Sequence, residues 1–559
     1  MKYIKLLILL FVGSFLSAQD INPTEVTVVE GFMPSIPSSE KITETASFTD
    51  TVEIDKTQTY RFLDKTIDAN YKAKPLKAAT VSGEKLSDLY ASKVTLGFGS
   101  QFTTLSRITV NSLRTDNFSY GLTLNHFANS YESGFYPIKF KNSLNQLNLF
   151  GKKIGEKNIV IANFQYDRRT ALYFEEISTS PEEKYFRNRF AYTKLGTSIV
   201  SKELSPYLLK HHTTFFISDL NEQSENQIHL SSVLRKTISG YPVNLEIEFN
   251  NYLNYSREET SFGRDKRDVK SFHFSPSTSF SKYGFDFDLG LEIHYQSDEY
   301  DSIMEIFPQI KITKELVKNI LSVEGGVRHL ENRHTIKSIS DENPYIHSFG
   351  TNQSVISNGY TLLLKTTDVD EAYISMRNVL GKDEVISGSV AYGHVKNLQS
   401  FVLTPNITYN RFLSYYQDVW QLHVNANYEW QINDLLGIHA NANYYNWGEE
   451  TVSQRAKVDV EASLSVNFQD KIKVYSSLSY LGKRSSVLGS YSYDEIIIVP
   501  NNNYELNPQL HANLLIHYNY TKLISAFVKI NNITNSKKDI WEGYREIGIN
   551  ALFGLSYSY

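Results

Sequence analysis

Residues 285–296 read FDFDLGLEIHYQ, and this stretch decides the fold class. Apolar side chains fill every odd position from Phe285 to Tyr295, while Asp, Gly, Glu, His and Gln fill the even positions from Asp286 to Gln296. A repeat of two residues places the two sets on opposite faces of a β-strand. The stretch therefore predicts a strand with one apolar and one polar face.

Residues 420–430 and 458–468 alternate in the same way over 11 residues each, and residues 243–253 do so except at Asn251 and Tyr252. Strands of soluble β-sandwiches usually have about 5–6 residues, whereas a tilted strand needs about 9–11 to cross a bilayer. The apolar faces often end in Tyr, Trp or Phe, as the aromatic girdle of a membrane barrel does. We predict transmembrane strands. A soluble sandwich or β-helix, which also alternates, is the alternative.

Composition agrees with an all-β membrane protein. The chain has 559 residues with 38 Tyr, 32 Phe, no Cys and a formal net charge of -5. Its mean hydropathy of -0.34 suits strands that alternate apolar and polar residues. The small, mixed charge gives no reason to expect a nucleic-acid partner. The absence of Cys excludes disulfides, thiolate metal sites, a Cys nucleophile and a lipid-modified N-terminal Cys.

The first 18 residues have the pattern of an export signal. Lys2 and Lys5 are basic, residues 4–12 are almost entirely apolar, and small residues precede a plausible cleavage site before Gln19. This apolar core is too short to span a bilayer. We therefore predict an exported envelope protein, with a signal peptide at 1–18, a periplasmic or lumenal segment at 19–91 and a barrel at 92–559.

Short and long connectors alternate along the chain between the predicted strands. Turns such as 237–240 and 281–284 are rich in Gly, Asn, Asp and Lys, whereas 332–370 is the longest connector. This rhythm predicts a single antiparallel up-and-down barrel of about 22 strands, with short periplasmic turns and longer extracellular loops. The assignment is weakest at 203–225 and 332–416, where merged strands would lower the count to as few as 16.

The chain ends as a strand that closes on aromatic residues. Phe553, Leu555, Tyr557 and Tyr559 share one face of residues 551–559. A membrane barrel must pair its last strand with its first, because open edges are not tolerated in lipid. We interpret these four residues as the terminal signal for barrel insertion. The expected partners are outer-membrane lipid and, during biogenesis, the barrel-assembly machinery.

Residues 524–559, ISAFVKINNITNSKKDIWEGYREIGINALFGLSYSY, resemble the barrel end of TonB-dependent receptors. The matching positions are Phe527, Asn531, Asn532, Ile533, Thr534, Asn535, Lys537, Lys538, Gly543, Tyr544, Gly548, Gly554, Leu555 and Tyr557. DENPYI at 341–346 and EAYISM at 371–376 resemble that family's Asn-Pro loop and Glu-containing strand. LSDLYASKVTLGFGS at 86–100 is similar to a Bacteroidota group of receptor-like barrels. The resemblance implies solute uptake or passage across the outer membrane.

The N-terminal segment departs from that family's pattern. TonB-dependent receptors carry a folded plug domain inside the barrel, and the 73 residues from 19 to 91 are too few and too aperiodic for a complete plug. Within them, Glu25, Val26, Thr27, Val28 and Val29 resemble a TonB box, a segment that adds a strand to a periplasmic partner. A generic β-prone stretch is the alternative. A TonB-type protein or other envelope proteins are therefore candidate partners.

Chemistry-bearing residues are expected to line the barrel. Asp286, Asp288, Glu292 and His294 share the polar face of residues 285–296 and are predicted to face the lumen. His423 and His439 lie on the two strands of one predicted hairpin, where metal binding or acid–base work is an alternative to plain lumen lining. The chain has no Gly-x-Ser-x-Gly, HExxH or phosphate-loop motif. We expect no enzyme, no cofactor and no metal.

Two functions are favoured from the sequence, and a barrel enzyme is the third and least favoured alternative. The first is a receptor-like barrel for solute uptake or porin-like passage, without catalysis. The second is a structural or assembly subunit that docks other envelope proteins and does not conduct. The connector 332–370 could fold over the mouth of the barrel, bind a ligand or dock a partner.

Overall fold

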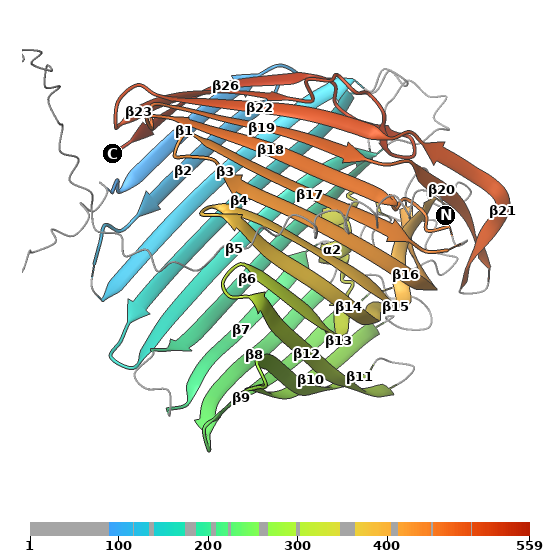
Figure 1. Ribbon diagram of the computed structural model, residues 1–559. Helices are drawn as coiled ribbons and strands as arrows, with labels where there is room; N and C mark the ends of the chain where they lie inside the picture. Colours follow the sequence, from blue (N-terminus) through green and yellow to red (C-terminus); the bar gives the residue numbers. More distant parts are fainter. Residues whose placement is uncertain are drawn as a thin grey trace, which may run out of the picture. The chain divides into compact units, whose positions relative to one another are not determined.

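The structure is a computed structural model of an all-β chain (Figure 1). It describes residues 89–115, 117–132, 139–173, 186–202, 208–221, 225–255, 266–297, 302–346, 364–403, 412–448, 451–492 and 495–559. The signal peptide and the TonB-box-like residues predicted from the sequence lie outside the described residues.

Twenty-two antiparallel strands form one closed barrel, which confirms the predicted fold and strand number. They are Ser92–Gly99 (β1), Thr104–Asn111 (β2), Phe118–Glu132 (β3), Lys139–Ile154 (β4), Asn158–Tyr173 (β5), Phe186–Ser201 (β6), Lys210–Asn221 (β7), Glu225–Ile238 (β8), Tyr241–Tyr255 (β9), Lys266–Lys282 (β10), Phe285–Ser297 (β11), Ser302–Val317 (β12), Leu321–Arg333 (β13), Thr366–Gly381 (β14), Glu384–Leu403 (β15), Phe412–Gln431 (β16), Leu436–Asn446 (β17), Val458–Phe468 (β18), Ile472–Leu481 (β19), Gln509–Asn519 (β22), Ile524–Asn531 (β23) and Asn550–Ser558 (β26).

Three smaller pieces lie in the loops. The strands β20 (Arg484–Ser492) and β21 (Glu495–Leu506) form a hairpin between β19 and β22, which pair directly with each other. A short hairpin of β24 (Asp539–Trp541) and β25 (Tyr544–Arg545) lies between β23 and β26. The helix α2 (Ile336–Glu342) lies between β13 and β14. Within the described ranges, no helix has the length and hydropathy needed to cross a membrane.

The barrel closes where the predicted terminal strand pairs with the first strand. In the register of β1 and β26, Lys93 lies opposite Ser558 and Gly97 lies opposite Gly554. β26 pairs with β23 on its other side. Closure leaves no open edge at this seam, as a sheet in lipid requires.

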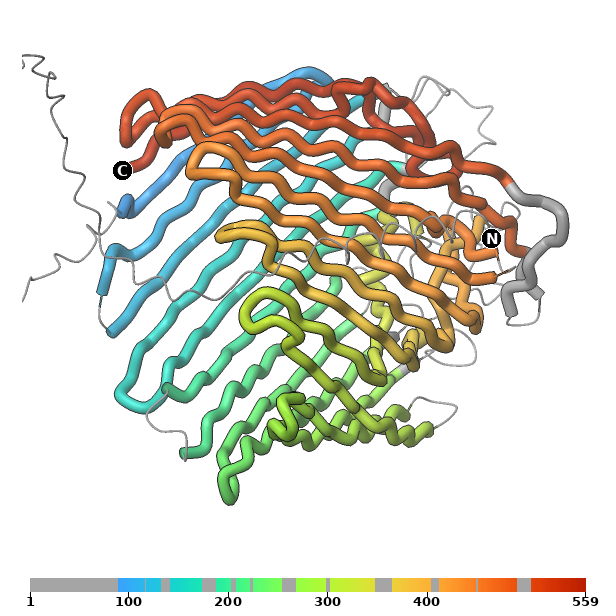
Figure 2. The backbone as a smooth tube through the Cα atoms, viewed as in Figure 1, coloured from blue at the N-terminus to red at the C-terminus, as the bar shows by residue number. Residues whose placement is uncertain are grey.

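The two ends of the barrel differ in their connections. At the turn end, tight turns such as 239–240 and 283–284 join the strands, and the C-terminus lies at the same end (Figure 2). Ser239 and Gly240 both have positive φ, as a two-residue hairpin turn requires. At the loop end, the connections are mostly longer and carry α2 and the two small hairpins. This matches the predicted alternation of short turns and long loops.

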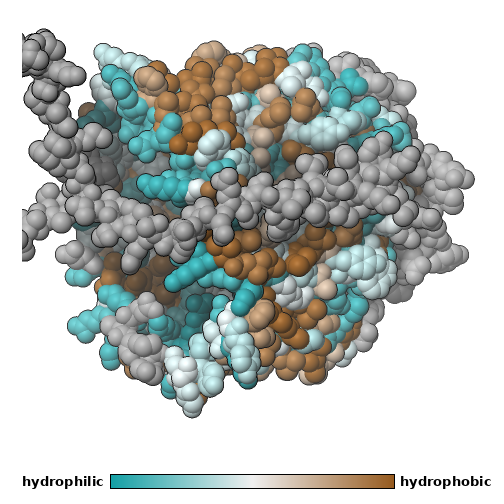
Figure 3. Space-filling model, in the orientation of Figure 1, coloured by the Kyte–Doolittle hydropathy of each residue, from teal (hydrophilic) through white to brown (hydrophobic). Residues whose placement is uncertain are grey.

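Large apolar side chains cover the outside of the wall. Leu96, Phe98, Ile374 and Trp420 are each more than half exposed, and Figure 3 shows apolar patches on the visible face. Such contiguous exposure is unfavourable in water, whereas it matches the apolar band of a barrel in a bilayer. The outer surface is therefore a membrane-facing surface.

Candidate functional site

A folded segment crosses the loop end of the barrel. Residues 334–346, which we call the lid, contain α2 and follow β13 directly. Figure 1 shows α2 inside the ring of strands, near the loop end. Lid residues contact β5, β6 and β8 on one side of the barrel and pair with Phe412 of β16 on another. Strands so far apart in the ring lie on nearly opposite walls.

The start of α2 is fixed by two acceptors. Thr335 is the N-cap, and its side chain accepts from the backbone N–H of Ser338 at 3.1 Å. The carboxylate of Glu225 on β8 accepts from the N–H groups of Ile336 at 2.6 Å and Lys337 at 3.0 Å. A carboxylate is favourable here because the free N–H groups of a helix start carry partial positive charge. Glu225 thus ties the lid to the wall.

An apolar cluster fills the space around the lid. Ile336 and Ile346 are fully buried, and Tyr345 stacks on Tyr544 with ring centroids 3.6 Å apart. The wall and loop residues that pack against the lid are Tyr131, Ala171, Phe190, Leu220, Phe401, Val402, Leu403, Phe412, Leu413, Trp541 and Tyr544. Because they come from both sides of the barrel and from the β23–β26 loop, the cluster joins these walls across the loop end.

Polar contacts hold the lid at its edges. The Asn188 side chain on β6 donates to the carbonyls of Pro344 and Ile346, each at 2.9 Å. Arg169 on β5 donates to the carbonyl of Asp341 at 3.0 Å. On the other side, a nitrogen of Arg455 lies 3.1 Å from a carboxylate oxygen of Glu342. These contacts are mostly to the lid backbone, so they depend on the lid keeping its fold.

His334 lies buried at the base of the lid. Its Nε2 is 2.8 Å from the hydroxyl of Thr367, and its ring lies 5.7 Å from that of Tyr416. Burial, followed by the positive charges of Arg455 and Arg333, lowers the pKa of His334 from its ordinary value to about 4. The folded lid therefore holds this imidazole neutral.

A second unusual region lies where β12 meets β13. Their ladder runs only as far as Ile310 opposite Val327 and ends before Pro308, which has no N–H to donate. Gly326 lies at this point, and a Cβ there would be 2.0 Å from the carbonyl oxygen of Ile310. The missing side chain lets β13 cross very close to β12 as the two strands separate.

Beyond this point the ends of β13–β15 lie on the lumen side of β11 and β12. We call this arrangement the wall overlap. Side chains that would face the lipid by alternation instead contact inward-facing side chains of the neighbouring wall. The rings of His329 and Phe307 stack with their centroids 3.8 Å apart, and Nζ of Lys396 forms an ion pair with Oε1 of Glu305 at 2.8 Å. The hydroxyl of Thr366 donates a hydrogen bond to Oε1 of Gln296 at 2.7 Å. The following contact is of the same kind: Nε2 of His294 lies 3.2 Å from Oε1 of Glu331.

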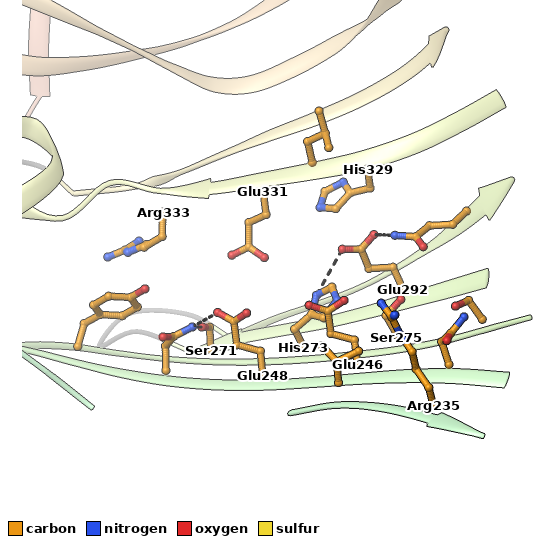
Figure 4. A pocket seen from close by; sticks show the side chains of 17 residues that line it. Arg235, Glu246, Glu248, Ser271, His273, Ser275, Glu292, His329, Glu331 and Arg333 are labelled. Atoms are coloured by element: carbon orange, nitrogen blue, oxygen red, sulfur yellow. Dashed lines mark hydrogen bonds and ion pairs between the residues drawn. The ribbon is translucent and has the colours of Figure 1, made fainter. Parts of the chain in front are cut away.

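A polar cavity of about 590 Å³, the wall cavity, lies between the two layers (Figure 4). It is lined by side chains of β8–β13, including Glu248, His273, Glu292, His329 and Glu331. No set of three or more His, Asp or Glu side chains in the described residues is arranged to hold a metal ion. The cavity is therefore a candidate site for a polar solute.

Comparison with solved structures identifies the architecture. The siderophore receptor PirA from Acinetobacter baumannii matches with a TM-score of 0.61 and 11% identity, over 85% of this chain and 81% of the receptor. The FrpB iron transporter from Neisseria meningitidis matches with a TM-score of 0.62 and 9% identity, over 85% and 82%. The outer-membrane ferripyoverdine receptor of Pseudomonas aeruginosa matches with a TM-score of 0.53 and 12% identity, over 85% and 72%.

The chain has a receptor-type outer-membrane barrel fold. Neither a scan against protein-family models nor a search of curated proteins gives a match. The apolar outer wall and this fold together place the protein in the outer membrane. By the usual orientation of such barrels, the turn end faces the periplasm and the loop end faces outward.

The four polar residues predicted on β11 have different surroundings. Asp288 forms an ion pair with Lys311 at 2.8 Å, and Asp286 contacts Ser281 near the turn end. Glu292 and His294 are buried in the wall overlap. Glu292 lines the wall cavity, where it accepts from the amide of Gln309 at 2.7 Å.

The predicted terminal residues and the histidine pair are also resolved. Phe553, Leu555, Tyr557 and Tyr559 are between 48% and 75% exposed on the outer face. The histidines of the β16–β17 hairpin are not brought together. His423 lies opposite Tyr445, and His439 lies opposite Glu429.

The receptor-like motif of the last loop has a structural role. The Asn532 side chain donates to the carbonyls of Ser536 and Ile547, at 2.7 and 2.9 Å. Asn535 accepts from the N–H of Ile549 at 3.0 Å, and a Cβ on Gly548 would lie 2.5 Å from that Asn535 oxygen. These residues fix the loop that presents Trp541 and Tyr544 to the lid.

The wall overlap is the feature that the sequence analysis missed. Its signal is present in residues 327–333, VRHLENR, where polar residues occupy both strand faces instead of one. The same loss of alternation occurs in 366–371, TTDVDE. Strand ends that are polar on both faces indicate a wall that does not contact lipid there.

Proposed function

We propose that this protein is a receptor-like barrel that takes up or passes a solute across the outer membrane, without catalysis, and that the lid is its outer gate. The observation that carries the proposal is the bridging position of residues 334–346 between opposite walls. A segment that bridges opposite walls lies in the path of a solute that enters from the loop end, so passage requires that it move.

The lid has the properties of a removable gate. A helix of seven residues is too short to be stable alone, so α2 depends on its contacts with the wall. A ligand that binds the open arrangement more tightly than the closed one would shift the population toward it. Such a ligand would act by competing with the contacts of Glu225, Asn188 and Arg455.

Energised uptake would require a periplasmic partner. The proposed contact is strand addition by residues 25–29 to a TonB-type protein, as the sequence resemblance implies. The test is co-purification of such a protein with native chain and with a Val26→Pro, Val28→Pro variant, since proline cannot donate the ladder hydrogen bonds. Equal recovery with both forms would remove this partner. Insertion guided by Phe553, Leu555, Tyr557 and Tyr559 is proposed on the same sequence basis.

The test of passage is planar-bilayer conductance of the purified protein, with and without residues 19–91. We expect steady or stepwise conductance from at least one form when a ligand or a lid variant opens the loop end. The heat-modifiable gel mobility of each form verifies that the barrel is folded. Silence from every folded form would contradict passage.

A second candidate is a non-conducting subunit that docks other envelope proteins. The observation in its favour is the complete burial of Ile336, Ile346, Phe401 and Phe412 around the lid, since a core of this kind also suits a permanent seal. Under this alternative, all folded forms stay silent and other envelope proteins co-purify from native membranes in fixed proportion.

A further inference from the structure

The wall cavity has a strongly acidic lining. Four carboxylates line it, those of Glu246, Glu248, Glu292 and Glu331, against the two guanidinium groups of Arg235 and Arg333. Figure 4 shows the carboxylates in the middle of the cavity, with Arg333 near one side and Arg235 near the other. A cationic group would find its counter-charges at the centre.

Uncharged side-chain amides already orient two of these carboxylates. The Asn250 amide donates to Glu248 at 2.7 Å, and the Gln309 amide donates to Glu292 at 2.7 Å. His273 lies 3.3 Å from the other oxygen of Glu292. A carboxylate oxygen accepts more than one hydrogen bond, so these groups keep capacity for a ligand's donors.

His329 provides an independent indication of a ligand. Its side chain is 1% exposed, and its Nδ1 lies 2.8 Å from a carboxylate oxygen of Asp370. Because a carboxylate accepts, Nδ1 carries a proton, and in the neutral imidazole Nε2 then presents a lone pair. Among the described residues, Nε2 has no hydrogen-bond partner although it is buried. In Figure 4 the ring projects from β13 toward Glu292 and His273.

The size and geometry distinguish the class of ligand. A volume of about 590 Å³ lies in the range of small-molecule sites, which is about 300–1,000 Å³. It is far larger than a bare ion needs, and no three His, Asp or Glu side chains of the described chain converge as metal ligands. Asn244, Ser271, Ser275 and Tyr252 add polar groups suited to hydroxyls.

We propose that the wall cavity binds a hydroxylated or polyamine organic cation, with its ammonium group among Glu248, Glu292 and Glu331 and a donor at Nε2 of His329. The cavity lies within the wall overlap, and of its lining residues only Arg333 adjoins the lid in the sequence, so this inference goes beyond the proposed passage of a solute. Bound there, the cation would join β11 to β13 where the ladder between β12 and β13 is absent.

The test is calorimetric titration of the full-length protein in detergent with glucosamine and spermidine. Glucose serves as the neutral match of glucosamine, and Zn²⁺ alone tests the metal alternative. We expect saturable binding of at least one amine, with glucose at least tenfold weaker than the amine that binds. Glu292→Gln should weaken amine binding at least tenfold, whereas Glu315→Gln, at an exposed turn-end position of β12, should leave it unchanged.

Each contrary result overturns the proposal. These results are no binding of either amine, binding of glucose as tight as that of the amine that binds, saturable binding of Zn²⁺ without binding of an amine, or unchanged amine affinity in the Glu292→Gln variant. Heat-modifiable mobility must match the native protein in every variant, and His329→Gln supplies a second variant if Glu292→Gln does not fold. Conductance is not a readout here, so failure of this site is distinguishable from failure of the proposed passage.

Discussion

The ring of Phe527 lies against Gly554, its cross-strand partner, so closely that a Cβ at position 554 would be 2.2 Å from two ring carbons. The same ring lies 3.2 Å from the position that a Cβ would take on Gly97, which pairs with Gly554 across the closing seam. One aromatic side chain thus covers two glycines on β26 and β1. Aromatic cover of this kind compensates for the missing side chains of glycines in a sheet.

Gly554→Ala should therefore weaken barrel closure, because the new methyl group displaces the buried Phe527 ring. Overpacking of this kind costs about 1–3 kcal/mol. The measurement is the temperature at which the folded band is lost in a heat-modifiable gel assay. Gly151→Ala is the matched control, since its Cβ would meet only the Phe118 ring at 3.9 Å. Equal melting of the two variants would contradict the role of this contact.

The barrel itself was predictable from local pattern. Alternation over residues 285–296 and its equivalents defines the strands, and the terminal strand pairs with β1 as closure in lipid requires. The alternation of turns and loops gave the strand number because each strand must return to the opposite end. These constraints act on each strand separately, so one sequence was enough.

The lid and the wall overlap were not predictable in the same way. Glu225 caps a helix that begins 111 residues later in the chain, and no local pattern links the two. His294 and Glu331 meet only because β13 crosses inside β12, although their polarity alone suits lumen lining equally well. Non-local contacts of this kind depend on the path of the whole wall.

Gly326→Ala should disrupt the wall overlap, whereas Gly325→Ala should not. A Cβ at 326 would collide with the Ile310 carbonyl at 2.0 Å, while one at 325 would approach only the Tyr373 carbonyl at 3.4 Å. The readout is cross-linking of a Gln296→Cys, Thr366→Cys pair in this cysteine-free chain. We expect efficient cross-linking in the native and Gly325→Ala backgrounds and a severalfold loss with Gly326→Ala. Undiminished cross-linking in all three would show that the overlap does not need Gly326.

Glu225→Ala should loosen the start of the lid. It removes the acceptor for two N–H groups of α2, and an unsatisfied buried donor costs about 1–3 kcal/mol. Hydrogen exchange of residues 335–343 should accelerate by at least tenfold. Glu429→Ala, which removes an exposed carboxylate of β16, should leave that exchange unchanged. Exchange that is equally slow in both variants would exclude Glu225 as the anchor.

Acid should loosen the lid through His334. Its pKa is lowered by burial, from an ordinary 6.5 to about 4, so the opened lid binds the proton more readily than the closed lid does. The contribution of His334 to the stability of the closed lid is fully present above pH 6.5 and falls by up to ~1.4 kcal/mol per pH unit as the pH drops toward 4. Hydrogen exchange of residues 335–343, corrected for its intrinsic pH dependence, measures this loss. The His334→Gln variant should lack this loss and keep only the opposite contribution of Glu225, because burial raises the pKa of that carboxyl to about 7. An unchanged acid-induced loss in the variant would assign the effect elsewhere.

The gate function is tested most directly by single-channel conductance of a variant whose lid cannot pack. Ile336→Ser, Ile339→Ser and Ile346→Ser together replace three side chains that are at most 1% exposed. The variant is compared with the native lid, in each case with and without residues 19–91, after heat-modifiable mobility has verified a folded barrel. We predict that the form with the substituted lid and without residues 19–91 conducts at least tenfold more than the matching form with the native lid. Equal silence of these two folded forms would contradict passage through the barrel.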